Sequence, residues 1–162
     1  MLEATWLSVR VDPSEGAYPS GLSSMAQAAH TLYLMTGERR YERAAREGMR
    51  MVAAQAVQAP SAFGTSLALM SRLAGEAEQL VVVLPEGGAT TEGALLEAAR
   101  RHGAPLVAVA TESQAAALAE AGFDLYTART SRDGLPTAYF CRDFVCRLPA
   151  TTPEELSAAR GR

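Results

Sequence analysis

Leu80-Val81-Val82-Val83-Leu84 is an unbroken run of five apolar residues that ends at Pro85. Because the run is short, β-branched at its centre and followed by Pro and Gly, it predicts a strand that is buried on both faces. A second apolar run, Leu106–Ala110, follows after a loop and a helical stretch. Two such strands joined through a helix make a βαβ unit, which requires a parallel pair and a right-handed crossover.

The segments after the first strand extend this unit. A helix is expected within residues 91–103, and another at about residues 113–121. Residues 123–126 and 137–141 predict two further short strands, the last of them antiparallel and at an edge of the sheet. A helix that starts behind Thr152 closes the chain.

The part of the chain before the first strand predicts helices. Apolar residues recur at helical spacing from Leu22 to Tyr33, with Ser20 as the cap and Gly37 as the stop. The same spacing returns at residues 41–56 and again at residues 61–74. The first two helices are joined by a short turn and should form an antiparallel hairpin. The expected fold class is therefore mixed α/β: a helical front half (1–75) packed on a small, mainly parallel sheet of three or four strands (76–162).

Composition and charge exclude several classes of function. The chain has 162 residues and a net charge of -3, so nothing in its charge suggests a nucleic-acid partner. No apolar run approaches the ~20 residues of a membrane span, and the N-terminal residues lack the pattern of a secretory signal, so we expect no membrane partner and a cytoplasmic location. All 15 basic residues are Arg, which excludes a lysine Schiff base and a P-loop lysine.

The two cysteines, Cys141 and Cys146, are one candidate catalytic site. The neighbouring Arg142 and Arg147 would favour a thiolate, so the pair suggests redox chemistry. The alternative is that both are small buried residues on a strand and its turn. A zinc site would need two more ligands, and the histidines are distant in sequence, so no metal is expected.

The loop after the first strand is a candidate binding site, because α/β folds place anions between a strand and the following helix. It has neither a dinucleotide fingerprint nor a P-loop, and Glu86 and Glu92 flank it with negative charge. A plain tight turn is the alternative, and no cofactor is expected. The candidate residues are Gly87, Gly88, Thr90 and Thr91.

His30 lies on the first predicted helix, beside its apolar face, and is a further catalytic candidate as a general base. The alternative is a structural role. His102 falls in the last turn of its helix, where the helix dipole favours a cation.

Three stretches of the chain resemble the C-terminal portion of the thioredoxin-domain-containing proteins related to the spermatogenesis-associated thioredoxin-like protein. The resemblance covers about Gly16 to Leu156. The motifs that carry it are Gly16-Ala17-Tyr18-Pro19-Ser20-Gly21-Leu22-Ser23, Leu34-Met35-Thr36-Gly37 before Tyr41, and the most specific one, Pro136-Thr137-Ala138-Tyr139-Phe140-Cys141-Arg142-Asp143-Phe144-Val145-Cys146-Arg147-Leu148-Pro149.

The resemblance implies a long protein with an N-terminal thioredoxin-like domain, an (α/α) toroid similar to N-acylglucosamine epimerases and six-hairpin glycosidases, and a small α/β part near its end. This chain lacks the thioredoxin-like domain and most of the toroid, so their catalytic residues have no counterparts here. Leu22 also stands where the family has Asn. What carries over is the last toroid hairpin and the segment that holds Cys141 and Cys146.

Three functions follow as hypotheses, and the sequence favours the first of them over the two alternatives. The first is a non-catalytic interaction module, whose helix faces pack on a second copy or on a protein that supplies the missing toroid hairpins. The second is a carbohydrate-processing enzyme, an epimerase or glycoside hydrolase assembled by oligomerisation, with Asp12, Glu15 or His30 as its candidates. The third is a thiol redox protein that uses Cys141 and Cys146.

Overall fold

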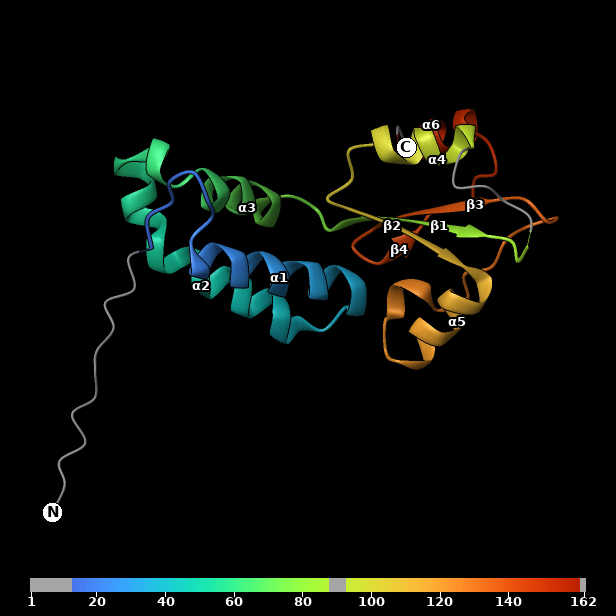
Figure 1. Cartoon of the computed structure of the whole chain (residues 1–162), viewed down its shortest axis with the longest axis horizontal. Helices are drawn as coiled ribbons and strands as arrows, with labels where there is room; N and C mark the ends of the chain where they lie inside the picture. Colours follow the sequence, from blue (N-terminus) through green and yellow to red (C-terminus); the bar gives the residue numbers. More distant parts are fainter. Residues whose placement is uncertain (1–12, 88–92, 161–162) are drawn as a thin grey trace, which may run out of the picture.

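The computed structural model describes residues 13–87 and 93–160. Three helices form a unit at one end of the molecule, and a four-stranded sheet with helices on both faces forms the other end (Figure 1). The structure confirms a mixed α/β fold in which a helical front half precedes a small sheet.

The helical unit consists of α1 (Gly21–Thr36), α2 (Arg39–Gln58) and α3 (Gly64–Ala74), with a short 3-10 turn (Pro60–Ala62) before α3. As expected, Ser20 caps α1 by accepting a hydrogen bond from the backbone N–H of Ser23 at 3.1 Å. Gly37 ends α1 with a left-handed backbone, φ 71°. The three helices share one core made of Ala26, Ala45, Met49, Val52, Ala56, Phe63, Leu69 and Leu73.

The sheet has the strand order β2-β1-β3-β4. Strand β1 pairs in parallel with β2, as the βαβ pattern predicts, and antiparallel with β3, which in turn pairs antiparallel with β4. The bounds are β1 (Glu78–Leu84), β2 (Leu106–Thr111), β3 (Thr137–Arg142) and β4 (Val145–Cys146).

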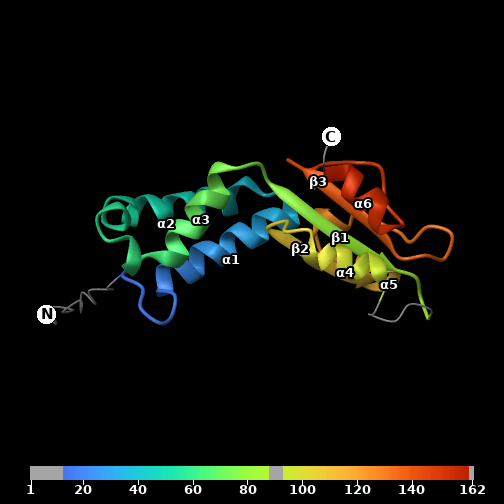
Figure 2. The ribbon, with the colours of Figure 1, turned by 90° about the horizontal axis from the view of Figure 1, so that it is seen from above.

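Helices cover both faces of this sheet, which explains the unbroken apolar run of β1. Leu80, Val82 and Leu84 pack against α4 (Ala94–Arg101) and α6 (Pro153–Arg160) on one face. Val81 and Val83 pack on the other face, against α5 (Glu112–Glu120) and a 3-10 turn, η2 (Asp124–Tyr126). Seen from above, α4 and α6 lie over the sheet while α1 to α3 lie beyond its end (Figure 2).

Three expectations about the sheet are wrong. It is not mainly parallel, because only one of its three strand pairs is parallel. Residues 123–126 form no strand: Asp124–Tyr126 is the turn η2, and Leu125 and Tyr126 pack under β1. An apolar run this short does not distinguish a strand from a helical turn by its periodicity. The strand at 137–142 is not at the edge, because the unexpected β4 pairs with its outer side.

The direction of β3 follows from the connection before it. After η2 the chain runs through an irregular segment, 127–136, and enters β3 beside the carboxyl end of β1, where Thr137 pairs with Val83. A strand that begins where its neighbour ends is antiparallel to it.

A small set of contacts joins the helical unit to the sheet. Tyr33 of α1 packs edge-on against Phe144, with their ring centroids 5.1 Å apart. The side-chain amide of Gln79 on β1 donates to the carbonyl of Leu34 at 3.4 Å. Within the described residues, no helix has the length and apolar character needed to cross a membrane.

Candidate functional site

The two cysteines form a disulfide across the hairpin of β3 and β4. Cys141 and Cys146 lie directly opposite each other in the register, and their sulfurs are bonded. Between the strands the chain reverses at Asp143 and Phe144, whose φ angles are 46° and 65°. Two consecutive residues with positive φ are typical of tight hairpin turns whose twist matches that of the strands. The turn therefore sets the register that brings the two sulfurs together.

Both cysteines line a pocket of about 440 Å³ where the sheet meets η2 and the end of α1. Cys141 is only 2% exposed, whereas Cys146 on the edge strand is partly exposed. Cys146 is therefore the more exposed of the two cysteines. The lining residues are Gly37, Gln79, Asp124, Leu125, Thr127, Arg129, Cys141, Phe144 and Cys146.

Arg129 places a positive charge against the accessible sulfur. Its Nη2 lies 2.7 Å from Cys146 Sγ, and its guanidinium stacks over the ring of Tyr139, 5.0 Å from the centroid. The Tyr139 hydroxyl donates to the carbonyl of Thr130 at 2.7 Å, which fastens the loop that carries Arg129 to the sheet.

No carboxylate among the described residues forms an ion pair with Arg129. Burial lowers the pKa of Arg129, and the group that opposes this shift is Tyr139. Its buried Nε has no hydrogen-bond partner among the described residues. An arginine stays protonated in proteins, so this cation is available to an anionic sulfur.

Gln79 provides a second polar group in the same pocket. The residue is fully buried, and its Oε1 has no hydrogen-bond partner in the described part of the chain. A buried acceptor without a partner is costly, which suits a position that meets a ligand donor.

The arrangement can stabilise a thiolate at Cys146. Reduction of the disulfide would leave Cys146 Sγ beside a half-buried guanidinium, and a nearby arginine is one of the features that lower the proton affinity of a cysteine. Cys141, buried behind it and still within the same hairpin, is placed to close the disulfide again.

His30 lies in a different pocket, of about 430 Å³, between the three helices and the turn of the β3–β4 hairpin. The two pockets share Gly37 and Phe144, but the cysteines do not line this one. Burial lowers the pKa of His30, and the charges of Arg72 and Arg46 lower it further. The structure thus separates the two kinds of catalytic candidate.

In the described part of the loop after β1, Glu86 makes a defined contact with α5. The Glu86 carboxylate accepts a hydrogen bond from the backbone N–H of Ser113 at 2.7 Å, in the first turn of α5. Gly87 has a left-handed backbone, φ 68°, as a tight turn requires. The other candidates of this loop, Gly88, Thr90 and Thr91, lie outside the described residues.

Glu15, a candidate for carbohydrate chemistry, has a structural role. Its carboxylate accepts hydrogen bonds from the backbone N–H of Thr65 at 2.6 Å and from the hydroxyl of Ser66 at 2.7 Å, at the start of α3. Burial raises the pKa of Glu15, but the hydrogen bonds from Ser66, Ser23 and Thr65 outweigh it, and the pKa is lowered overall. Asp12 lies outside the described residues.

His102 is not in the environment that the sequence suggested, in which the end of a helix favours a cation. It is buried against Phe140, with ring centroids 4.7 Å apart, and neither ring nitrogen has a hydrogen-bond partner among the described residues. Burial lowers the pKa of His102, and the charge of Arg160 lowers it further.

Sequence reasoning missed the residues that surround the disulfide. It assigned the thiolate partners to the neighbouring Arg142 and Arg147, and the Arg142 side chain pairs with Glu78 at 2.9 Å. The partner is Arg129, which is 17 positions from Cys146. The spacing of residues along the chain does not indicate such a contact. The sequence shows only that an arginine lies within an otherwise polar loop.

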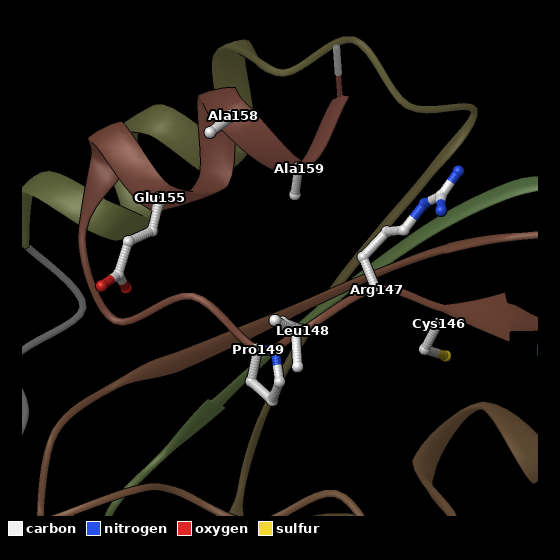
Figure 3. A pocket seen from close by; sticks show the side chains of 7 residues that line it. All are labelled: Cys146, Arg147, Leu148, Pro149, Glu155, Ala158 and Ala159. Atoms are coloured by element: carbon white, nitrogen blue, oxygen red, sulfur yellow. The ribbon is translucent and has the colours of Figure 1, made fainter. Parts of the chain in front are cut away.

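A groove of about 620 Å³ lies beneath α6. It is lined by residues 146–149 together with Glu155, Ala158 and Ala159. In Figure 3 the sulfur of Cys146 points away from α6, whereas Leu148 and Pro149 lie below that helix. The groove therefore lies beside the disulfide, but Arg129 and Gln79 do not line it.

Comparisons with protein families, with curated proteins and with solved structures found no significant match for this chain. Among the described residues, no group of three or more His, Cys, Asp and Glu side chains is placed to hold a metal ion. The candidate site is therefore defined by its geometry alone.

Proposed function

We propose that this chain carries out thiol–disulfide exchange, with Cys141 and Cys146 as its redox pair. The observation that carries the proposal is the contact of 2.7 Å between Arg129 Nη2 and the accessible Cys146 Sγ. A purely structural disulfide does not need an unneutralised cation against one sulfur, whereas a reactive cysteine does.

The exchange uses the two sulfurs in sequence. In the reduced protein the Cys146 thiolate attacks a disulfide substrate, the substrate S–S bond breaks, and one substrate thiolate leaves and takes a proton from solvent. Cys141 then loses its proton and attacks Cys146 Sγ, which releases the second substrate thiol and forms the Cys141–Cys146 bond. One substrate disulfide becomes two thiols while the protein dithiol becomes a disulfide, and a low-molecular-weight thiol reverses the step by the same chemistry.

A cytoplasmic location, which the sequence led us to expect, is part of this proposal. In mesophiles, cytosolic disulfides are usually transient and serve catalysis or redox sensing, because the compartment keeps thiols reduced. A cycling pair is the kind of disulfide that this compartment allows.

Glutathione disulfide offered to the reduced protein tests the proposal. We expect the wild type to end as the intramolecular disulfide, and the Cys141→Ser variant to end as a mixed disulfide at Cys146, seen by mass spectrometry as one added glutathione. Cys146→Ser should acquire glutathione much more slowly, because Cys141 is buried. Equal rates in the two variants, or no reaction of the wild type beyond that of free cysteine, would contradict the proposal.

The second candidate is an interaction module, favoured by apolar side chains that stand free on the helical unit. Met25 on α1 is 72% exposed, and Met51 and Val57 on α2 are 75% and 76% exposed. We infer that these side chains belong to a surface that meets a partner, either a second copy or a protein that supplies neighbouring hairpins.

Light scattering behind a sizing column tests the second candidate. Self-association predicts a multiple of the 17.1 kDa chain mass, and the Met25→Ser/Met51→Ser double variant should return to the monomer. A wild type that stays monomeric at all concentrations, and that captures no partner, rules out this function without affecting the redox test.

A further inference from the structure

The pocket that contains His30 is built unlike the rest of the surface. Three arginines from different parts of the helical unit converge on it: Arg39 and Arg46 from α2, and Arg72 from α3. At its base lie His30 and Tyr33 of α1, 6% and 8% exposed. The pocket therefore combines a buried polar floor with a cationic rim.

The charges of this pocket do not cancel. Glu42 is shared by two of the arginines, since it accepts from Arg39 Nη1 at 2.9 Å and from Arg46 Nε at 2.9 Å. The other acid in the lining, Asp143, accepts from the backbone N–H of Ala77 at 3.1 Å. Arg72 forms no ion pair with a carboxylate among the described residues. The positive charge of Arg72 is therefore not balanced within the pocket.

The imidazole of His30 is the second, independent sign of a ligand. It is nine-tenths buried, it lines the cavity, and no hydrogen bond joins its ring to another described residue. The ring nitrogens of His30 are not among the fully buried polar atoms that lack a partner, so they are open to the cavity and can bond to a ligand there.

Glu42 does not suit acid catalysis at this position. Burial raises the pKa of Glu42, but the hydrogen bonds and charges of Arg46 and Arg39 outweigh it and leave the pKa lowered. A glycosidase acid needs a raised pKa, so the pocket is better fitted to hold an anion than to protonate a leaving group.

We propose that this pocket binds a small phosphate-type dianion through Arg46, Arg72 and the ring of His30. Guanidinium groups match the geometry of phosphate oxygens and bind them in pairs of hydrogen bonds. The volume of about 430 Å³ leaves room for a small organic group beside the phosphate, so the ligand class is inorganic phosphate or a phosphate monoester. The proposal does not depend on the redox activity of the cysteines.

Binding should be coupled to the protonation of His30. The groups that face it from the neighbouring helices are Arg72, Arg46 and Glu42, and Tyr33, Arg39 and Asp143 line the same pocket. The two arginines disfavour a charged imidazole, and a bound dianion would remove that repulsion. Sulfate, which stays a dianion from pH 6 to 8, should therefore bind more tightly at pH 6.

Calorimetric titration of the whole chain with sodium phosphate, and with sodium sulfate at pH 6 and pH 8, tests the site. We expect saturable binding, and a loss of at least about tenfold in affinity for Arg72→Gln and for Arg46→Gln. Arg43→Gln is the matched control, since Arg43 is an exposed residue of α2 outside the pocket. A small phosphate monoester such as glycerol phosphate, titrated in parallel, distinguishes free phosphate from an ester as the preferred ligand.

Three results would overturn the site. They are the absence of saturation below about 50 mM phosphate, equal weakening by Arg43→Gln and Arg72→Gln, and equal effects of chloride and sulfate at matched ionic strength. NMR of the His30 ring protons provides a readout that does not rely on the arginine variants, because their shifts must move with sulfate in the wild type. Unfolding curves of each variant establish that a lost affinity is not a lost fold.

Discussion

Reduced protein that carries Arg129→Gln should react with iodoacetamide at pH 7 roughly tenfold more slowly than the reduced wild type. The reason is that the guanidinium at 2.7 Å favours the thiolate form of Cys146, and the amide that replaces it carries no charge. The rate should approach that of the wild type as the pH rises above about 9.5, where the thiol of either protein is ionised. Rates measured from pH 5 to 10 in the Cys141→Ser background isolate the behaviour of Cys146.

Arg132→Gln is the matched control for this experiment. Arg132 is an exposed arginine of the same segment, and it does not line the pocket of the disulfide. We expect its pH–rate profile to coincide with that of the wild type. If the pH–rate profile of Arg129→Gln also coincides with that of the wild type, the contact does not activate Cys146. The redox proposal would then lose its main support.

Glu15→Gln should lower the free energy of unfolding at pH 7 by about 1.5–3 kcal/mol. The buried carboxylate accepts hydrogen bonds from Thr65 and from both the backbone and the hydroxyl of Ser66. These are charge-assisted bonds at the start of a helix, and the neutral amide would turn an N–H group toward donors. Urea unfolding followed by circular dichroism measures the difference.

The loss should depend on pH in a defined direction. Because the folded pKa of Glu15 is lowered below 4.5, the carboxylate contributes stability above that value and loses it as the pH falls through the folded pKa. The gap between wild type and Glu15→Gln should therefore be full at pH 7 and shrink below about pH 4.5. Glu47→Gln, an exposed position of α2, should show no gap at either pH; a Glu15 gap that stays constant into acid would contradict the role of the charge.

Patterns with a short period predicted most elements of this fold. The run Leu80–Leu84 is buried throughout because helices cover both faces of its strand. Ser20 and Gly37 mark the ends of the first helix, since a cap and a left-handed stop depend on neighbours within one turn. Strands β1 and β2 pair in parallel, as a strand–helix–strand sequence requires.

The antiparallel direction of β3 was predicted and is confirmed, but the turn η2 and the existence of β4 did not follow from the same reasoning. Two apolar residues in a row, Leu125 and Tyr126, serve equally well as a strand or as a turn packed under the sheet. Strand β4, Val145–Cys146, is too short for any periodicity. Only the pairing with β3 and the two positive φ values of the turn define it.

The sequence by itself determined which residues are candidates for a site: Cys141, Cys146 and His30 were all singled out from their chemistry. Tertiary structure alone decided what surrounds them, because Arg129 meets Cys146, and Arg72 meets His30, only after the chain has folded back on itself. Local spacing reports on contacts within a turn of helix or a strand pair. The charges that tune a site come from segments far apart in the chain, so the electrostatics of both pockets belong to the fold.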